Sequence, residues 1–397
     1  MELVGVVGKP NVGKSTFFAA ATLAPAQIAN YPFTTVEPNK GRAVVRARCP
    51  HLDLKKPCHP NNSACQDGVR LVPVELLDVA GLVPRAHEGR GLGNKFLDDL
   101  RQANALIHVV DASGGTDFEG NPVPIGSHDP LEDLAFLEEE IAHWIRGILQ
   151  RGWDKASRAA EMDETPVEKI LHERLTGLGL SEPQVKMAVN DAALGPRPVT
   201  WTDEEFLRLG RHLQRRGKPM LVAANKADLA SPETLERLAG WKGGTVIPCC
   251  GDYELALRKA AKAGLVRYEP GAGTFAYTSE PSLTAPQRAA LDRIHGYLAL
   301  HGETGVQHCL EEVVRKTLNL ITVYPVEDET HWTDKKGNIL PDAFLLPQGS
   351  TARDLAFKVH TDLGQHFIRA IDARTKMVVG QTHPLEEGAV LKIVAKV

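Results

Sequence analysis

Nine residues near the start of the chain have the types and spacing of a phosphate-binding loop. Residues 8–15 fit the pattern G-x-x-x-x-G-K-[ST], Thr16 follows them, and the stretch comes directly after an apolar run. Glycines let the backbone turn its N–H groups toward phosphate oxygens, and a helix that starts here adds the positive end of its dipole. Lys14 would reach the β- and γ-phosphates of a nucleotide, and the Ser15 hydroxyl would ligate Mg²⁺. The nucleotide contacts expected from this loop are Gly8, Asn11, Val12, Gly13, Lys14, Ser15 and Thr16.

Two further short motifs complete a nucleotide site. Asp78 and Gly81 fit D-x-x-G, in which the carboxylate holds Mg²⁺ through a water and the glycine N–H faces the γ-phosphate. Asn225, Lys226 and Asp228 fit N-K-x-D. The aspartate carboxylate can accept hydrogen bonds from both N1–H and the exocyclic amine of guanine, whereas adenine offers the opposite pattern there. The three motifs together predict a guanine nucleotide as the ligand.

The elements around these motifs have the order that such a site needs. Each motif stands at the end of an apolar, β-branched run, and the carboxyl ends of parallel strands meet at one edge of a sheet. Two stretches rich in proline, threonine, glycine or charge, 29–40 and 85–94, predict mobile loops. The strands expected in the first part of the chain cover residues 3–7, 42–46, 69–78, 105–111, 218–228 and 244–248.

Composition narrows the class of protein. The chain has 397 residues, which predicts two or three domains, and a net charge of −4 with a pI near 6.4. No apolar run approaches 18 residues, and no charged and apolar leader precedes the first strand. We therefore expect a cytoplasmic monomer that contacts neither a membrane nor a specific DNA sequence, although a local basic face could still bind RNA.

Three of the six cysteines gather in one polar excursion between two strands. Cys49, His51, Cys58 and Cys65 supply four soft or borderline ligands, enough for a tetrahedral Zn²⁺ ion. The spacing is not a standard C-x-x-C pair, and His59 is a competing ligand. The alternative is a solvent-facing hairpin with free thiols.

With its three nucleotide motifs, the sequence resembles the translation-associated GTPases of the Obg superfamily, in the archaeal-type branch related to YchF. The resemblance covers essentially the whole chain. Its more specific marks are the segments 30–35, 81–83 and 89–94 and, near the far end, 346–356. It implies an α/β fold: a P-loop NTPase G domain with a helical insertion, followed by a TGS domain, a small β-grasp module resembling ubiquitin.

The resemblance also implies roles for loop residues. Thr35 would be the switch threonine that reaches Mg²⁺ when GTP is bound. Leu82 stands where many GTPases place a water-orienting glutamine, so hydrolysis would need other help. One candidate for this help is Asn11, which would recruit K⁺ to the transition state. Another is His87 as a neutral imidazole; the alternative for His87 is a hydrogen-bonded loop histidine. The expected catalytic residues are Asn11, Lys14, Thr35, Gly81 and His87.

The chain departs from the family pattern at two places. YchF resembles nucleotidases that lost the base-reading motif and prefer ATP, whereas Asn225 to Asp228 is intact here and favours GTP. The loop that usually offers a serine-alanine pair has Cys250 and Gly251, whose backbone N–H groups could still contact the guanine oxygen.

We expect three parts in the chain. They are a G domain over 1–275, with a helical insertion at 129–216 and the cysteine excursion at 47–70, a helical linker region over 276–316, and the TGS domain over 317–397.

The main hypothesis is a slow GTPase, cycling between GTP and GDP with Mg²⁺, that reports its state to a ribosome or RNA through the TGS domain and the insertion. The insertion could instead only stabilise the fold. Residues 317–397 hold nine Lys or Arg against ten Asp or Glu, so their charge leaves a protein partner open. Two rival hypotheses are a nucleotide-gated protein- or ligand-binding module with little turnover, and a relative that uses ATP.

Overall fold

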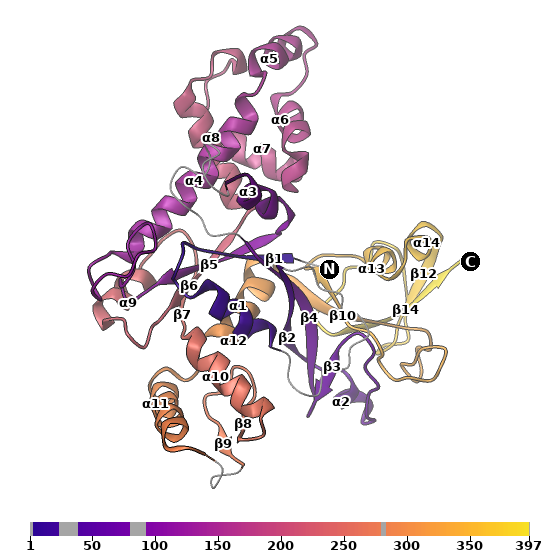
Figure 1. Cartoon of the computed structure of the whole chain (residues 1–397). Coiled ribbons are helices and arrows are strands. Elements are labelled where there is room, and N and C mark those ends of the chain that lie inside the picture. Colours follow the sequence, from indigo (N-terminus) through magenta and orange to yellow (C-terminus); the bar gives the residue numbers. More distant parts are fainter. Residues whose placement is uncertain (1–2, 24–38, 80–92, 279–282, 397) are drawn as a thin grey trace.

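A seven-stranded sheet forms the centre of the molecule. The computed structural model describes residues 3–23, 39–79, 93–278 and 283–396, and Figure 1 shows it with a helical arm above this sheet and a smaller lobe beside it. The sheet order is β2-β4-β1-β5-β6-β7, and β3 pairs with β4 off this path. From β4 to β7 the neighbours on the path are parallel, while β2 and β3 run antiparallel to β4. The strands are β1 (Leu3–Val7), β2 (Lys40–Arg48), β3 (Ala64–Gln66), β4 (Val69–Asp78), β5 (Ala105–Asp111), β6 (Met220–Asn225) and β7 (Val246–Pro248).

Helices cover both faces of this sheet, because β1, β5 and β6 are buried along their whole length. One apolar cluster joins alternate residues of β1, such as Val4 and Val6, to α1 and α12. Leu3 and Val7, at the two ends of β1, face a second cluster that includes α3, α4 and α8. The helices are α1 (Lys14–Thr22), α3 (Gly93–Gln102), α9 (Pro232–Ala239) and α10 (Gly251–Lys262); a short α2 (His51–Leu54) lies in the cysteine excursion.

The helices predicted between Asp129 and Arg216 form the arm at the top of Figure 1. Asp129 caps the first of them by accepting a hydrogen bond from the Leu131 N–H at 3.1 Å. The Trp153 and Trp201 rings stack at 5.3 Å inside the arm. Its elements are α4 (Pro130–Gln150), α5 (Trp153–Met162), α6 (Val167–Leu175), α7 (Glu182–Asp191) and α8 (Asp203–Gly217), with 3₁₀ turns at Thr176–Leu178 and Pro198–Thr200.

The segment between the sheet and the lobe belongs to the body of the G domain. Strands β8 (Val266–Arg267) and β9 (Ala276–Tyr277) form a hairpin, so residues 268–273 lie in its connecting loop. Helix α11 (Ala285–His301) follows, then α12 (Val306–Glu312) with a π-helical turn at Val313–Thr317. The buried side chains of α12 and this turn share the apolar cluster of β1 and α1. Most of the expected linker region is therefore packed structure.

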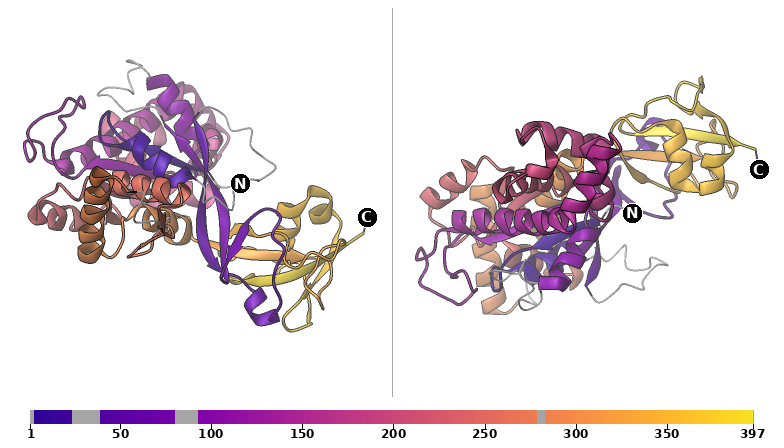
Figure 2. Two further views of the ribbon diagram at one scale, coloured as in Figure 1. Left: turned by 60° about the horizontal axis from the view of Figure 1, so that its bottom comes forward. Right: turned by 90° about the horizontal axis from the view of Figure 1, so that it is seen from above.

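The C-terminal lobe is a β-grasp domain, seen at the right of Figure 2. Its sheet order is β11-β10-β14-β12-β13, with β10 and β14 parallel and the other pairs antiparallel. The helix expected over 352–362 breaks at His360, which has extended backbone angles. The elements are β10 (Leu320–Val326), β11 (Phe344–Pro347), α13 (Ala352–Val359), α14 (Thr361–Gln365), β12 (Phe367–Asp372), β13 (Val378–Val379) and β14 (Ala389–Ala395).

The α/β fold class is thus confirmed: a G domain with a helical insertion, followed by a β-grasp domain. No helix in the described ranges is long and apolar enough to cross a membrane.

Candidate nucleotide-binding site

The phosphate-binding loop lies between β1 and α1, as the pattern predicts. Gly13 has φ +89°, a left-handed conformation that glycine adopts without strain. A Cβ atom there would lie 2.3 Å from Asn225 Nδ2, and a Cβ at Gly8 would lie 2.5 Å from the Val109 carbonyl oxygen. The hydrogen-bonded Asn225 side chain at Gly13 and the Val109 backbone at Gly8 therefore leave no room for a Cβ atom at either position.

The expected Mg²⁺ residues from the described part of the chain lie at the same edge of the sheet. Strands β1 and β4 are parallel neighbours with Val6 opposite Asp78, so Asp78 stands beside the loop that follows β1. The Lys14 ammonium forms an ion pair with the Asp78 carboxylate. Ser15, in the first turn of α1, is exposed. A hydroxyl and a carboxylate are oxygen ligands of the kind that Mg²⁺ prefers, so this donor set fits the ion.

Asn225 ties the phosphate loop to the loop that follows β7. Its Nδ2 donates to the Val12 carbonyl oxygen at 2.9 Å, and its Oδ1 accepts from the Gly251 N–H at 2.9 Å. Asn225 is buried, so both bonds are shielded from water. The sequence predicted Asn225 as a nucleotide contact, and the structure shows it as the link between the two loops.

Lys226 also contacts the phosphate loop. Its Nζ donates to the Asn11 carbonyl oxygen at 3.0 Å and pairs with Asp111 Oδ2 at 2.8 Å. Asp111 also accepts from the Thr116 hydroxyl at 3.1 Å. Asp111 was not among the predicted site residues, although its place at the end of a buried strand was a signal. Its buried carboxylate fixes the lysine of the base-reading motif.

The carboxylate that the sequence predicts to read the base, Asp228, has a thiol partner. Cys250 Sγ donates to Asp228 Oδ1 at 3.2 Å. Burial, and then the neighbouring Asp228 carboxylate, raise the pKa of the Cys250 thiol. The thiol therefore keeps its proton at neutral pH and remains a donor. Cys250 orients Asp228, a role that no motif in the sequence indicates.

The segment between β5 and α4 packs against the phosphate loop. The Asn11 side-chain Nδ2 donates to the Gly120 carbonyl oxygen at 2.9 Å. A Cβ at Gly120, which has φ +85°, would lie 2.6 Å from the Pro10 carbonyl oxygen. The side chain expected to recruit K⁺ is thus held by this segment through its amide nitrogen.

A buried ion pair joins the loop to the helical arm. Lys9 Nζ donates to Asp133 Oδ1 on α4 at 2.9 Å and to the Thr116 carbonyl oxygen at 2.9 Å. His128 Nε2 lies 2.8 Å from the same Asp133 oxygen. Lys9 and Asp133 are each only 5% exposed in their side chains. Removing one charge would leave the other buried with fewer partners.

We therefore expect Lys9→Met to lower the free energy of unfolding by about 3 kcal/mol, the range for breaking a buried pair. Chemical denaturation of the full chain measures this change. The matched control is Lys335→Met, because the Lys335 and Glu327 side chains are 83% and 53% exposed and 3.8 Å apart. The control should change stability by less than about 0.5 kcal/mol. Equal effects of the two variants would contradict the buried pair's contribution.

Three predicted site residues, Thr35, Gly81 and His87, lie outside the described residues, as do Leu82 and the parts 29–38 and 85–92 of the two predicted loops. Their roles stay predictions.

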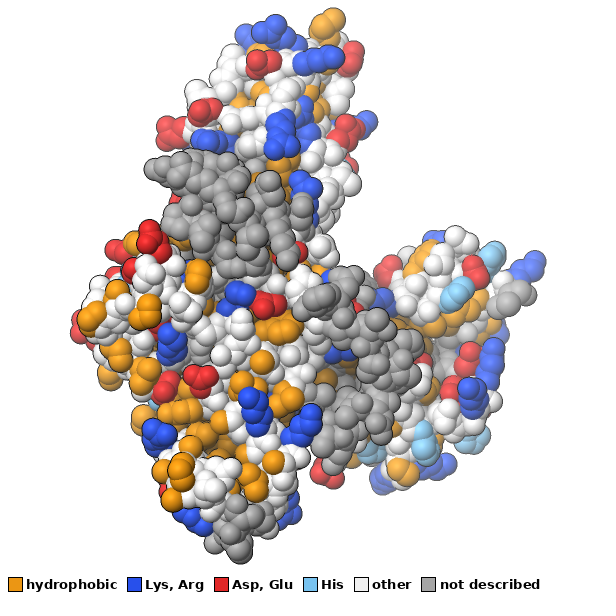
Figure 3. Space-filling view, in the orientation of Figure 1, with side chains coloured by type: hydrophobic (Ala, Val, Ile, Leu, Met, Phe, Trp, Pro, Cys, Tyr) orange, Lys and Arg blue, Asp and Glu red, His pale blue; other side chains and the backbone are white. Residues whose placement is uncertain are grey.

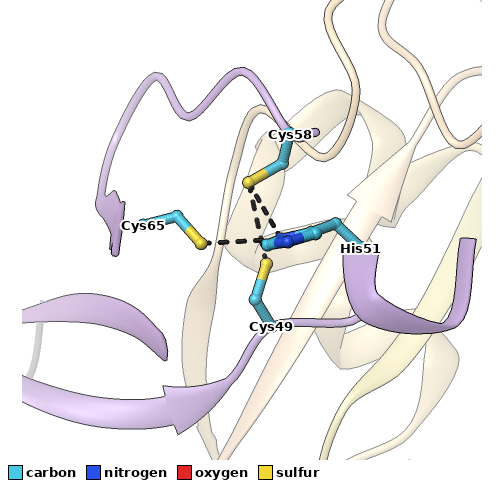
Figure 4. Close-up of side chains that lie close together, drawn as sticks. All are labelled: Cys49, His51, Cys58 and Cys65. Atoms are coloured by element: carbon cyan, nitrogen blue, oxygen red, sulfur yellow. Dashed lines mark hydrogen bonds between the residues drawn. The ribbon is translucent and has the colours of Figure 1, made fainter. Parts of the chain in front are cut away.

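The four predicted metal ligands form a cluster of side chains, shown in Figure 4. Cys49, His51, Cys58 and Cys65 each offer a ligand atom, and these atoms all lie within 4.8 Å of one another. The sequence spacing is irregular, yet the turn around α2 and strand β3 brings the four together. The competing ligand, His59, is not part of the group. Its Nδ1 instead accepts a hydrogen bond from the Ile339 N–H at 3.4 Å.

A phosphate loop, a carboxylate beside it and a base-reading loop, all at the carboxyl edge of a parallel sheet, define a P-loop G domain. Family models match all three parts of the chain. They are described as "50S ribosome-binding GTPase" over residues 3–146, "Obg-like GTPase YGR210-like, G4 motif-containing domain" over 223–328 and "TGS domain" over 331–395.

Known proteins agree with these matches. The GTP-binding protein MJ1332 of Methanocaldococcus jannaschii is 50% identical over 397 residues, covering 100% of this chain and 99% of that protein. The crystal structure of a GTP-binding protein from Pyrococcus horikoshii is 43% identical, with a TM-score of 0.78 and full coverage of both chains. The ribosome-binding ATPase YchF of Haemophilus influenzae is 29% identical and covers 92% of this chain and 86% of its own. The chain belongs to the Obg-like, YchF-related family of GTP-binding proteins with a C-terminal TGS domain, which confirms the family expected from the sequence.

Proposed function

We propose that this protein hydrolyses GTP to GDP and phosphate and uses the two nucleotide states as a switch on the ribosome. The observation that carries the proposal is the arrangement of Asn225, Asp228 and Cys250. Asn225 joins the phosphate loop to the Gly251 N–H through two buried hydrogen bonds, and Cys250, the residue before Gly251, donates to the Asp228 carboxylate that would read guanine. A site that accepted any nucleotide would not need a carboxylate held in this way.

The residues at the sheet edge have clear tasks in such a reaction. Lys14 would neutralise charge on the β- and γ-phosphates, and the first turn of α1 would direct its backbone N–H groups at the same oxygens. Ser15 and Asp78 would hold Mg²⁺, which supplies charge neutralisation at the γ-phosphate when it is bound. Water would attack the γ-phosphorus in line with the leaving oxygen. With leucine at position 82, we expect slow turnover in the isolated protein.

Two further functions compete with this proposal. The relative YchF is called an ATPase, but the intact Asn225 to Asp228 motif favours guanine in this chain. A nucleotide-gated binding module with little turnover would use the same site. The K⁺ role of Asn11 stays a prediction, and it requires the Oδ1 atom, because the nitrogen donates to Gly120.

The ribosome is proposed as partner on three grounds. The family model over the G domain is named for 50S ribosome binding, YchF is called ribosome-binding, and the TGS domain presents a separate lobe. The face of that lobe seen in Figure 3 carries Lys, Arg, Asp, Glu and His side chains interspersed. Contact through this lobe would therefore depend on shape and hydrogen bonds more than on charge.

Cosedimentation with purified ribosomes tests the switch. We expect the full chain to pellet with ribosomes at least about 10-fold more in one nucleotide state than in the other, when GTP with a non-hydrolysable γ-linkage is compared with GDP. Deletion of residues 317–397 should lower binding in both states if the lobe makes the contact. Absence from the pellet in every nucleotide state would favour the nucleotide-gated module with another partner.

A further inference from the structure

We propose that Cys49, His51, Cys58 and Cys65 bind one Zn²⁺ ion, and that this ion holds the excursion over residues 47–70 in the shape that docks the C-terminal domain. The excursion projects from the edge of the central sheet toward the lobe (Figure 2). The proposal is independent of the nucleotide site.

Three of the six distances between the ligand atoms match a tetrahedral zinc site, and all six lie within 4.8 Å. With Zn–S bonds of about 2.3 Å and Zn–N bonds of about 2.0 Å, the edges of a tetrahedron are about 3.8 Å between two sulfurs and about 3.5 Å between sulfur and nitrogen. Cys49 Sγ and Cys58 Sγ are 3.8 Å apart. His51 Nδ1 lies 3.3 Å from Cys58 Sγ and 3.5 Å from Cys65 Sγ (Figure 4). An ion could occupy the centre with little backbone movement.

The chemistry of the four ligands favours zinc. Three thiolates and one imidazole form a set with soft and borderline donors, and no carboxylate belongs to it. Such a closed set with four protein ligands is typical of structural zinc rather than catalytic zinc, which keeps an open position. Binding would release the three thiol protons. With a neutral imidazole, the loaded site would carry a net charge of −1.

A buried arginine lies beside the cluster and would pair with this negative charge. Arg70 is fully buried, and its Nη1 lies 3.7 Å from Cys58 Sγ. Its Nη2 donates to the Leu340 carbonyl oxygen, and its guanidinium lies 5.6 Å from the centre of the Tyr324 ring. No carboxylate in the described ranges forms an ion pair with Arg70. A buried cation needs a counter-charge, and the zinc–thiolate group would provide it.

The excursion between the ligands carries the contacts to the C-terminal domain. The His59 N–H donates to the Ile339 carbonyl oxygen at 2.8 Å, and the Asn61 N–H donates to the Pro341 carbonyl oxygen at 2.6 Å. Asn62 exchanges two hydrogen bonds with the backbone of Ala343, at 2.9 and 3.0 Å.

These contacts depend on a segment with little regular structure of its own. Three of the contact residues, 59, 61 and 62, lie between the ligands at 58 and 65, a span that contains only the first two residues of β3. Asp53, on the four-residue α2 between the ligands at 51 and 58, pairs with Arg374 at 2.6 Å. A metal that closes both short loops would fix their backbones, and the contacts to residues 339–343 would follow.

Metal analysis of the purified full chain is the first test. We expect about one zinc per chain in the wild type and in His59→Ala, and less than about 0.2 in Cys58→Ser. Replacement by Co²⁺ in the wild type should give the intense visible absorption of a tetrahedral thiolate site, which needs no variant to fold. A wild-type chain that takes up no zinc or cobalt, or a Cys49–Cys58 disulfide found by mass spectrometry, would overturn the site. Another metal bound at these four residues would overturn its assignment to zinc.

Hydrogen exchange tests the docking role. Removal of zinc from the wild type by a strong chelator should speed amide exchange at residues 59–62 and 339–343 by about 10-fold or more. Exchange in α1 and GTP binding should not change. Cys58→Ser should show the same pattern without chelator. Zinc loss with unchanged exchange at 339–343 would leave the metal site but overturn its role in docking, and general acceleration across the chain would contradict a local role.

Discussion

Asp228→Asn is expected to weaken GTP binding strongly and to create binding of xanthosine triphosphate. The asparagine amide presents a donor where the carboxylate accepts from the guanine amine, so two donors would face each other. Xanthine has a carbonyl at that position and can accept from the amide. Losing two charge-assisted hydrogen bonds costs about 3 kcal/mol or more, which lowers GTP affinity by about 100-fold or more.

Competition binding with labelled nucleotide measures this exchange of preference. The matched control is Asp252→Asn, an exposed carboxylate in the first turn of α10, which should leave both affinities unchanged. Cys250 would still donate to the remaining oxygen of residue 228, so the loop should keep its shape. A variant that loses GTP without gaining xanthosine triphosphate would mean that Asp228 supports the loop and does not read the base.

Lys14→Met is expected to remove GTP hydrolysis and to weaken GTP binding by about 100-fold. The methionine keeps much of the length of the side chain but removes the charge that faces the β- and γ-phosphates. The variant also breaks the Lys14–Asp78 pair, whose side chains are 14% and 26% exposed. We expect this loss to change the free energy of unfolding by less than about 1 kcal/mol, because both groups reach solvent.

Phosphate release under single-turnover conditions and denaturation of the same samples separate the two effects. Lys9→Met should differ from Lys14→Met by its large loss of stability. Hydrolysis at the wild-type rate in Lys14→Met would contradict the assignment of this lysine to the phosphates.

The sequence predicted the parts of the site that stand at strand ends. Asp78 closes a strand, and Asn225 ends the next-but-one strand along the chain, so a parallel sheet had to bring them to the edge that carries the phosphate loop. The apolar runs with sharp turn signals indicated where the strands lie. The helical arm was equally predictable, because its apolar residues recur at intervals of three and four.

The contacts between those parts were not predictable, because they join residues far apart in the chain. Lys9 and Asp133 are separated by 124 positions, and neither was a predicted contact of the nucleotide. Asn225 matched a pattern for base contact, but its two hydrogen bonds to Val12 and Gly251 depend on the spacing of three loops. The thiol of Cys250 had no pattern to indicate that it would face Asp228.

The same limit applies to the C-terminal half. The segment before the β-grasp domain contained a helix pattern and was expected as a linker region, but Val306 and Leu310 of α12 are buried against the central sheet. The short strands β12 and β13 alternate weakly and carry exposed apolar residues such as Ile368 and Val378. Tertiary packing, rather than local pattern, defines these elements.

The most direct test of GTP specificity is the relative use of GTP and ATP by the wild-type chain. We predict that, with Mg²⁺ and equal nucleotide concentrations, GTP is bound at least about 100-fold more tightly than ATP and is the nucleotide that is hydrolysed. Equal affinity for the two nucleotides, or hydrolysis of ATP alone, would contradict the role given to Asp228 and with it the assignment as a GTPase.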